Sequence, residues 1–541
     1  MTTQKIFVNA NIITMDPAAP TAEAIGVSGD TISVVGTRAA AESWAANSGG
    51  GSPEIIDLNG ATVIPGLIDS HSHITAGSLW GAHANCSSVT CQSIEDVQAQ
   101  IEALAKQKEP GQWVMGFGYD DTGIADMRHL TYADLDAVST EHPIFISHVS
   151  GHLAYMNSKA LELAEITSAT PNPSGGEIHK DDAGEPTGLL LENAAFDARK
   201  LLPLPDRDGI KELLLKKIAD YNATGLTSTH DGGIGLSSSG PNFISIFNEL
   251  DHAGELNIRV YGNIIMQAWP EYKKLGFRSG FGSNYFRIGG VKWFQDGSIQ
   301  GLTGALLDDY HEKPGWRSEL IYPQEQLNEM FCEAQAAGEH IIVHGNGDAA
   351  IESILQALEL AQEKHPREDN RHMLIHCQMA NPAYNHIERI IALGVIPSYF
   401  INHIYYWGDR HKDIFIGPER AARLNPLGSS LEKGMIFSAH SDYPITPIDP
   451  LFTIHCAVNR LTRSGDVLGP DERISPLEAL KTFTTHAALC SFEEDIKGSI
   501  EVGKLADLTV LSDDILTVEP TTIKDIQVLR TVVGGKTVFE A

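Results

Sequence analysis

The chain has 541 residues, which is too long for one small hydrophobic core, so we expect one large domain with additions. Its hydrophobic content of 42% and charged content of 20% are typical of a soluble globular protein. The formal charge of −31, from 39 basic and 70 acidic residues, argues against nucleic acid and anionic membrane as partners.

Nothing in the sequence indicates export or membrane insertion. No apolar stretch is long enough to span a bilayer, and the N-terminus reads as the start of a strand rather than as a signal peptide. The six cysteines lack the spacing of a zinc finger or of a redox motif. We therefore expect a cytoplasmic protein with reduced thiols.

The two ends of the chain have similar sequence patterns. Short β-rich runs cover residues 6–13, 24–35 and 54–63, and the pairs Gly29-Asp30 and Asn59-Gly60 are typical of hairpin turns. Similar runs cover residues 506–512 and 528–539, the latter folded about Gly534-Gly535. We predict that residues 1–64 and 490–541 form one composite β-sandwich side domain.

Between the ends, apolar strands alternate with amphipathic helical stretches such as 324–337 and 349–363. This alternation is typical of a parallel α/β barrel. We predict a (β/α)8 TIM-like barrel over residues 65–489, because eight strands can be counted. The predicted strands are residues 63–73, 225–231, 258–265, 286–296, 340–344, 372–377, 395–401 and 435–442.

The first gap of the barrel is anomalous. From His73 to Gly225 the chain is far longer than one βα unit, which takes about 30 residues. We therefore predict an α/β insertion at 78–205, with strands of its own at 113–119 and 143–148.

Ionisable residues lie at the ends of the predicted strands. A strand alternates its faces, so His71 and His73 point the same way and can grip one cation. A lone histidine is more often a hydrogen-bonded core residue than a ligand. Several at the same end of one barrel are hard to explain by packing and indicate a metal site. The members of this set are His71, His73, Lys292, His344, His376 and Asp442.

Lys292 has two interpretations. An ammonium beside divalent cations is unfavourable, and desolvation would lower its pKa and favour the neutral amine. That amine can take up carbon dioxide and become an anionic carbamate, which could bridge two metals. The alternative is a structural ion pair with Asp296, four residues along the same strand face. The residues alone leave both open.

Asp442 ends the last predicted strand. A carboxylate there can take a proton from metal-bound water and pass it to a leaving group, while the metal lowers the water pKa to about 7 and polarises a carbonyl. This division of labour predicts hydrolysis, with metal-bound hydroxide as nucleophile and Asp442 as general base. Asp442 could also be a plain metal ligand, or serve as both.

At Pro65-Gly-Leu-Ile-Asp-Ser-His71-Ser-His73 the chain resembles the amidohydrolase superfamily. The segment Gly498-Ser-Ile-Glu-Val-Gly-Lys504-Leu-Ala-Asp507 resembles its closing segment. Gly151-His152-Leu-Ala-Tyr-Met-Asn157, Lys292 with Asp296-Gly-Ser, and His344 with Gly347-Asp348 are similar to the family 3 branch that contains N-substituted formamide deformylases.

The resemblance implies a binuclear site, usually with zinc. His71, His73 and Asp442 would hold one metal, and His344 and His376 the other. Carboxylated Lys292 would bridge the two ions together with a hydroxide. A homodimer is a further expectation of the family.

The resemblance also implies residues that face the substrate. His152, on the insertion, looks like a substrate-facing residue rather than a ligand. Family members often carry Gly-Ser-Asp before the final carboxylate, whereas this chain has His440-Ser441-Asp442. His440 could therefore line the site, support a ligand, or belong to the core.

Aromatic residues near the predicted barrel mouth favour a small-molecule substrate with an apolar or aromatic group. The run at 402–411 includes Tyr405 and is typical of a lid or a binding wall in a surface loop. Together with Trp80 and Trp316 it would supply apolar surface. Ordinary packing of the insertion is the alternative.

Three readings of function compete. The first is a metal-dependent hydrolase of a linear C–N bond, such as an amide or an N-substituted formamide. The second is a deaminase on the same barrel, which counts as weaker because no glutamate follows His344 and Lys292 would have no role. The third is a catalytically silent protein, which should have lost ligands. Ester or lactone hydrolysis stays an alternative, because the same hydroxide attacks those carbonyls.

Overall fold

The computed structural model describes residues 4–47, 52–81, 83–235 and 243–541. These residues form two compact units. The larger unit contains the described residues of 4–75 and 215–541, and the smaller one contains those of 76–214.

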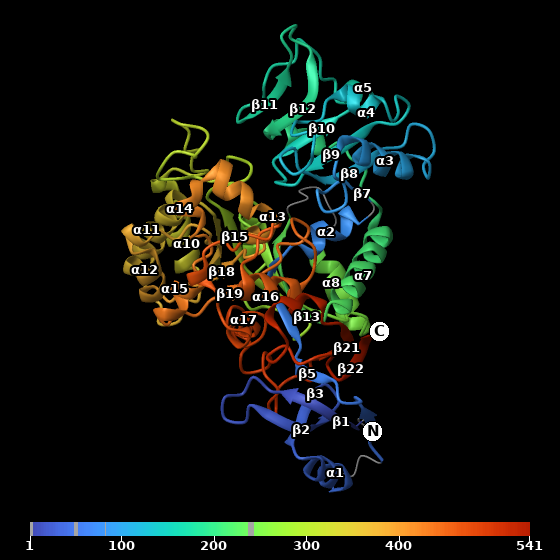
Figure 1. Ribbon diagram of the computed structural model, residues 1–541, viewed down its shortest axis with the longest axis vertical. Coiled ribbons are helices and arrows are strands. Elements are labelled where there is room, and N and C mark those ends of the chain that lie inside the picture. Colours follow the sequence, from blue (N-terminus) through green and yellow to red (C-terminus); the bar gives the residue numbers. More distant parts are fainter. Residues whose placement is uncertain (1–3, 48–51, 82, 236–242) are drawn as a thin grey trace. The chain divides into compact units, whose positions relative to one another are not determined.

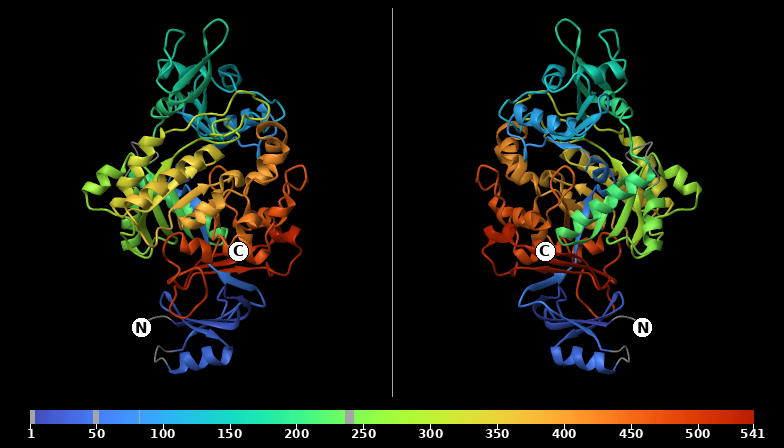
Figure 2. Two further views of the ribbon diagram at one scale, coloured as in Figure 1. Left: turned by 90° about the vertical axis from the view of Figure 1, so that its left-hand side faces the viewer. Right: turned by 90° about the vertical axis from the view of Figure 1, so that its right-hand side faces the viewer.

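Both ends of the chain form one eight-stranded sheet in the larger unit, with the order β22-β21-β20-β5-β1-β2-β3 and β4 paired to β1. Figures 1 and 2 show its N-terminal strands in blue beside its C-terminal strands in red. The predicted hairpins at Gly29-Asp30 and Gly534-Gly535 are confirmed, since each pair joins two antiparallel strands. The strands are β1 (Gln4–Ile13), β2 (Thr21–Ser28), β3 (Thr31–Gly36), β4 (Glu54–Asp57), β5 (Thr62–Pro65), β20 (Leu508–Leu511), β21 (Val528–Val533) and β22 (Lys536–Glu540).

The hairpin predicted at Asn59-Gly60 is wrong. Strands β4 and β5, on either side of this turn, do not pair with each other; both lie parallel to β1. The register of β1 breaks between Val8 and Ile12, so β4 pairs with its first half and β5 with its second. The turn therefore carries the chain past an irregularity in β1.

The second sheet of the larger unit has eight parallel strands and confirms the predicted TIM-like barrel. Its order is β19-β18-β17-β16-β15-β14-β13-β6. The seam between β19 and β6 is closed by single bonds: the Asp442 amide donates to the His71 carbonyl over 3.2 Å, and the Ser70 hydroxyl to the Ala439 carbonyl over 3.0 Å. The strands are β6 (Leu67–Ser72), β13 (Leu226–Ile234), β14 (Arg259–Ile265), β15 (Phe286–Phe294), β16 (Ile341–Gly345), β17 (Met373–His376), β18 (Ile396–Tyr399) and β19 (Ser438–Ala439).

Two barrel strands differ from the predicted ones. Predicted strand 63–73 is two strands in two sheets, because the chain changes partners at Gly66. A Cβ at Gly66 would lie 2.2 Å from Thr227 Oγ1, so the residue must be small. Predicted strand 435–442 shrinks to Ser438–Ala439, since the chain turns and Asp442 takes a φ of 52°.

Helices cover the outside of the barrel, with α10, α11 and α12 visible along one side in Figure 1. In α10 the buried Leu327, Phe331 and Ala334 recur at helical spacing and form one apolar stripe. None of the helices in the described part of the chain is long and apolar enough to cross a membrane. Around the barrel, the helices of three or more turns are α7 (Arg207–Ala223), α8 (Phe243–Ala253), α10 (Gln324–Ala336) and α11 (Asp348–Lys364).

The shorter helices fill the remaining connections and the N-terminal sheet region. They are α1 (Arg38–Asn47), α9 (Trp269–Lys274), α12 (His386–Ala392), α13 (His403–Arg410), α14 (Gly417–Ala421), α15 (Leu427–Glu432), α16 (Pro450–Asn459), α17 (Pro476–Lys481) and α18 (Thr485–Leu489). The run at 402–411, expected as a loop, is α13, and a π-helical turn over His411–Phe415 follows it. Its apolar side is buried, which a loop of this composition could not achieve.

The smaller unit contains a six-stranded sheet with the order β11-β12-β10-β9-β8-β7. The predicted strands at 113–119 and 143–148 are confirmed as β8 (Val114–Tyr119) and β9 (Ile144–His148). Asn157 begins a helix here by accepting a hydrogen bond from the Ala160 amide. The other elements are α2 (Ile74–Trp80), β7 (Ala84–Asn85), α3 (Ile94–Ala105), α4 (Tyr132–Asp136), β10 (Leu153–Met156), α5 (Ser158–Leu163), β11 (Gly176–Lys180), β12 (Pro186–Glu192) and α6 (Asn193–Arg199).

Some expectations stay predictions. They are the boundaries at 1–64, 65–489, 490–541 and 78–205, the homodimer, and the cytoplasmic location.

A buried ion pair joins the barrel to the terminal sheet. Arg259 at the start of β14 donates from Nε and Nη2 to the two carboxylate oxygens of Asp507, over 2.6 and 2.9 Å. Both side chains are almost fully buried. Asp507 also accepts the Gly534 amide. The two sheets therefore share one charge pair.

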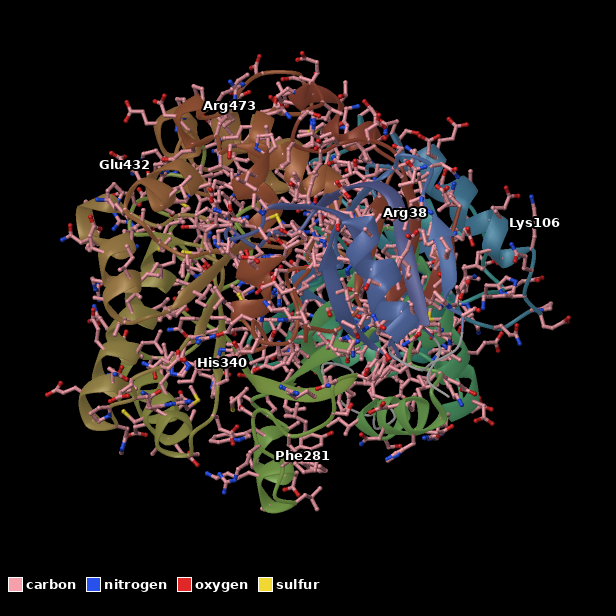
Figure 3. All side chains as sticks on the ribbon, turned by 90° about the horizontal axis from the view of Figure 1, so that it is seen from below. Arg38, Lys106, Phe281, His340, Glu432 and Arg473 are labelled. Carbon is pink, nitrogen blue, oxygen red and sulfur yellow. The ribbon has the colours of Figure 1, made fainter. Side chains whose placement is uncertain are left out.

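We expect Asp507→Ala to lower the free energy of unfolding by about 3–5 kcal/mol, because it leaves a buried guanidinium without its counter-ion. Urea unfolding followed by circular dichroism measures the loss. The exposed pair Arg38–Glu42 on α1 is the control (Figure 3 labels Arg38), and Glu42→Ala should leave the free energy of unfolding almost unchanged, because solvent screens this pair. Equal losses in both variants would contradict a structural role for the buried pair.

Candidate metal centre

Three side chains meet at the seam of the barrel. His71 lies in β6, His73 directly follows it, and Asp442 lies beyond β19. Asp442 Oδ1 is 3.4 Å from His71 Nε2 and 3.3 Å from His73 Nε2. The sequence prediction that both histidines point the same way agrees with this geometry.

Gly232, in β13, makes room for the two imidazoles. A Cβ at this position would lie 2.4 Å from His71 Cε1 and 2.6 Å from His73 Cε1, closer than any real contact. Sequence reasoning missed this residue. The pair Gly232-Gly233, which directly follows the predicted strand 225–231, is the signal that could have found it.

Two further histidines face each other across neighbouring strands. His344 Nδ1 and His376 Nε2, from β16 and β17, are 3.0 Å apart. The other nitrogen of His344, Nε2, lies 3.1 Å from the Gly297 carbonyl. The Gly297 carbonyl accepts a proton from Nε2 and would leave the Nδ1 lone pair facing His376, whereas Asn346 Nδ2, 3.0 Å from Nε2, can donate to Nε2 and would move the proton to Nδ1. Metal binding through Nδ1 requires the first of these two tautomers.

Lys292 lies within β15, two residues before its end, rather than at the end as the sequence predicted. Its Nζ is 3.3 Å from His71 Nε2. Burial lowers the pKa of Lys292 to about 7, although the carboxylates of Asp442 and Asp231 act in the opposite direction. A neutral amine is therefore available at neutral pH.

The alternative partner of Lys292 is engaged elsewhere. The carboxylate of Asp296 accepts the backbone amides of Ala305, Asn346 and Gly347. Within the described ranges, no ion pair joins Lys292 to Asp296. Asp296 thus fixes the loop after β16, and the ion-pair interpretation of Lys292 loses its support.

A second carboxylate supports the turn that carries Asp442. Asp69 accepts the backbone amide of His71 over 3.2 Å and the hydroxyl of Ser441. Burial raises the pKa of Asp69 to about 7. Asp69 therefore links β6 to the residue before Asp442 and sets the distance between the two sides of the seam.

His440 is fully buried. Its Nε2 lies 3.1 Å from His376 Nδ1, and its Nδ1 lies 2.8 Å from Ser398 Oγ. Its ring stacks on Phe400, with the centroids 5.1 Å apart. The structure thus places His440 behind His376, where it supports a candidate ligand, which is one of the three roles that the sequence left open.

The geometry fits divalent cations. Asp442 Oδ1 is buried and has no hydrogen-bond partner among the described residues, although a bare buried carboxylate oxygen is costly. Ligands at about 2.0–2.2 Å from a tetrahedral zinc lie roughly 3.3–3.6 Å apart. The separations of this oxygen from the two Nε2 atoms match. Burial also lowers the pKa of His71 and His376 well below its usual value, so both stay neutral, as ligands must be.

Other predicted substrate residues lie at separate places. On the smaller unit, His152 Nδ1 is 2.9 Å from Glu192 Oε2, and Trp80 packs near Phe117. In the larger unit, Trp316 is 39% exposed and its indole donates to the Leu302 carbonyl. Tyr405 packs against Phe452. None of these contacts includes a predicted metal ligand, so their roles stay predictions.

Aromatic side chains that the prediction did not select lie beside the ligands instead. The Phe400 ring is 5.5 Å from that of His376, and His403 packs between Phe400 and Trp407. His403 Nδ1 lies 2.9 Å from His411 Nε2. The residues of this aromatic region that lie nearest the candidate ligands are Phe400, His403 and Trp407; the role predicted for Tyr405 in substrate binding stays a prediction.

A third group of possible ligands, Asp120, Asp121 and His148, lies in the smaller unit. His148 Nδ1 accepts the Ser150 amide, so the proton is on Nε2, which donates to Asp121 over 3.0 Å. The ring then offers no lone pair to a metal. These contacts indicate a structural hydrogen-bond network.

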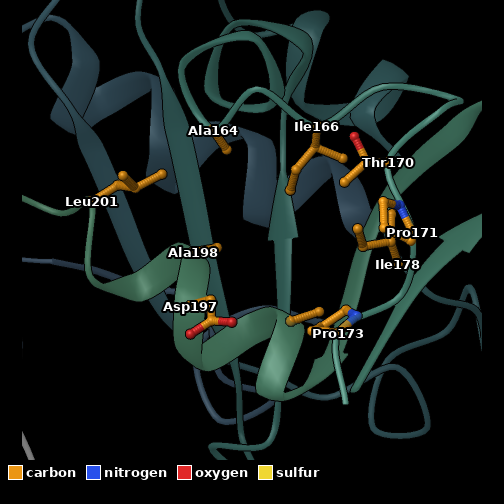
Figure 4. A pocket seen from close by; sticks show the side chains of 10 residues that line it. Ala164, Ile166, Thr170, Pro171, Pro173, Ile178, Asp197, Ala198 and Leu201 are labelled. Atoms are coloured by element: carbon orange, nitrogen blue, oxygen red, sulfur yellow. The ribbon is translucent and has the colours of Figure 1, made fainter. Parts of the chain in front are cut away.

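A cavity of about 260 Å³ in the smaller unit is lined mainly by apolar side chains, including Ile166, Pro171 and Leu201 (Figure 4). Its charged lining residue, Asp197, pairs with Lys200 over 2.7 Å. The lining offers no nucleophile or metal ligand set, so the cavity is not a centre of chemistry.

Comparisons with known proteins agree with this centre. A family model described as "Amidohydrolase family" matches residues 54–539. An N-substituted formamide deformylase from Arthrobacter pascens is 30% identical over 99% of this chain and 98% of its own length. The putative amidohydrolase YtcJ from Bacillus subtilis (strain 168) is 30% identical over 91% of this chain and 92% of its own length. The solved structure of an uncharacterized metal-dependent hydrolase from Pyrococcus furiosus is 26% identical, with a TM-score of 0.74 over 95% of this chain and 100% of that one.

We expect Gly232→Ala to lose bound metal, because the new methyl group displaces both imidazoles, and to destabilise the fold by about 1–3 kcal/mol. Metal per chain and the free energy of unfolding measure the two effects. Gly304→Ala is the control, because its Cβ would meet no atom closer than 3.2 Å. Wild-type metal content in Gly232→Ala would show that the two imidazoles can bind metal without the space beside Gly232.

Proposed function

This chain belongs to the amidohydrolase family, and from that premise we propose that it is a metal-dependent hydrolase of a linear C–N bond, in an amide or an N-substituted formamide. The observation that carries the proposal is the convergence of ligand atoms at the seam. One carboxylate oxygen and four imidazole nitrogens face one another at 3.0–3.4 Å in two groups.

The two groups give two ions their ligands. His71, His73 and Asp442 would hold one ion, and His344 and His376 the other. Imidazole with a single carboxylate favours zinc over the hard cations magnesium and calcium, which take oxygen ligands. Zinc is therefore the proposed metal.

Lys292 would join the two ions as a carbamate. Its neutral amine attacks the carbon of carbon dioxide and releases one proton, which leaves an anionic carbamate with two oxygens. Three features support this: complete burial, a pKa lowered to about 7, and the absence of an ion pair with a carboxylate among the described residues.

Bound divalent ions supply a Lewis acid and a water of lowered pKa. Asp442 then acts as general base: its carboxylate accepts a proton from water and passes it to the leaving nitrogen, since an amine leaves readily only when protonated. Bonds to the Asp442 backbone fix this carboxylate, because its amide donates to His71 and its carbonyl accepts the Ile445 amide.

Deamination is the weaker candidate. Asp348, the acidic residue after His344, accepts the Leu307 amide and the Asn381 side chain, so its carboxylate is used in the fold. Esters and lactones present the same carbonyl to the same centre and belong in the substrate panel. Phe400, whose ring is 5.5 Å from that of His376, and Trp407, whose ring is 6.4 Å from that of Phe400, support an apolar or aromatic group on a small substrate. His152, held by Glu192, is the proposed substrate contact of the smaller unit.

Metal analysis with a substrate panel tests the function. We expect about two zinc equivalents per chain, and turnover of N-substituted formamides or amides. Asp442→Asn should lower kcat by about 10²–10⁴-fold, because it removes the general base, with wild-type circular dichroism. A protein that binds no added zinc, or an Asp442→Asn variant with wild-type kcat, would rule the mechanism out.

Lys292→Ala separates the carbamate from a packing role. We expect the loss of one or both metals and of turnover, with partial rescue by short carboxylic acids, which replace the missing anionic oxygens. Lys292→Met is the matched control, since it fills the space but leaves none for an added acid. Wild-type metal content in Lys292→Ala would contradict the bridge.

A further inference from the structure

His440 stands two residues before Asp442, yet its ring contacts a different part of the centre. Both nitrogens are committed, Nε2 to His376 Nδ1 and Nδ1 to Ser398 Oγ. Ser398 Oγ continues to Ser70 Oγ over 2.8 Å, and Ser70 to the Ala439 carbonyl over 3.0 Å. His440, Ser398 and Ser70 are at most 1% exposed. A buried chain of hydrogen bonds thus runs from His376, a proposed metal ligand, to the barrel seam.

The acceptors at the end of this hydrogen-bond chain determine which atom donates in each bond. Ser70 Oγ contacts two acceptors, the Ala439 carbonyl and, over 2.9 Å, Ser438 Oγ. Its single proton goes to one of them, so Ser70 accepts from Ser398 in either case. Ser398 in turn accepts from His440 Nδ1–H. His440 Nε2 then carries a lone pair and accepts the proton of His376 Nδ1.

The consequence falls on the neighbouring ligand. With its proton on Nδ1, His376 turns its Nε2 lone pair toward His344 Nδ1, 3.0 Å away. This is the tautomer in which Nε2 can bind a cation. We propose that His440 is a positioning residue that holds His376 in its metal-binding tautomer. It does so through a hydrogen-bond chain that runs over the hydroxyls of Ser398 and Ser70 to the barrel seam. The inference rests on the proposed metal centre.

His440 as a third ligand is the competing assignment, because ligand atoms of His376, His440 and Asp442 lie within 4.8 Å of one another. The contacts disfavour it. A ligand would need its Nε2 lone pair for the metal, but this lone pair accepts from His376. The stacked Phe400 ring and Ser398 hold the imidazole from its other sides.

Three variants of the full-length protein test the role of this hydrogen-bond chain. His440→Gln can accept from His376 and donate to Ser398, His440→Leu can do neither, and Ser398→Ala removes only the acceptor of His440. Zinc binding to the metal-free proteins is measured by competition with a chromophoric chelator, with far-UV circular dichroism as the check on folding.

We expect wild type and His440→Gln to bind two zinc ions. In His440→Leu the affinity of one site should fall about 10–100-fold, as is typical when the partner of a ligating histidine is lost. Ser398→Ala should show a smaller loss at the same site. Since Ser398→Ala keeps every imidazole, it tests the hydrogen-bond chain even if His440→Leu fails to fold.

Each other outcome is decisive. Wild-type affinity in both His440→Leu and Ser398→Ala overturns the positioning role. If a folded His440→Gln loses a zinc ion as fully as His440→Leu, His440 is a ligand and the role is overturned as well. A wild-type protein that binds no zinc overturns the proposed function itself, which the other two results leave standing.

Discussion

The structure depends on the desolvation of a set of acceptor atoms at one end of the barrel. The ring nitrogens of His71 and His376 are buried, and burial keeps both imidazoles neutral. His376 Nε2 and His344 Nδ1 then lie 3.0 Å apart, and Asp442 adds an oxygen that has no hydrogen-bond donor within the described part of the chain. A hydrophobic interior could not tolerate such an arrangement for its own sake, because each unsatisfied group destabilises the fold. Bound cations would satisfy these acceptor atoms. The same ions would then both stabilise this region and supply its chemistry.

The contacts that close the seam of the barrel also position the residues of the candidate metal centre. Strand β19 contributes only two residues to the sheet, and the remaining closure comes from single bonds at His71, Ser70 and Asp442. A long ladder at this edge would fix the strands but leave no space for side chains to turn inward. The short strand, followed by a residue with positive φ, is what lets Asp442 reach the histidines of β6. Barrel closure and ligand spacing cannot be varied independently.

Most of the barrel could be predicted from the sequence, because buried parallel strands are continuous apolar runs and the ligands follow them. His71, His73, His344 and His376 come together as expected for that reason. What could not be predicted depends on partners far away in the chain. The split at Gly66 arises from Thr227, the room at Gly232 from two imidazoles, and the position of His440 from serines on two other strands. No local pattern records a tautomer or a register, so the role of His440 required three-dimensional contacts.

The composite terminal sheet has a consequence for biosynthesis. Strand β5 pairs with β20, and Arg259 of the barrel pairs with Asp507, so early segments find partners that are made much later in translation. Contacts between residues so distant in sequence are slow to form, because a long loop must close first. Until β20 is made, the nascent chain carries β1 to β5 with an unpaired edge, which is a template for association with other chains. The terminal sheet can therefore complete its pairing only once β20 to β22 have been synthesised.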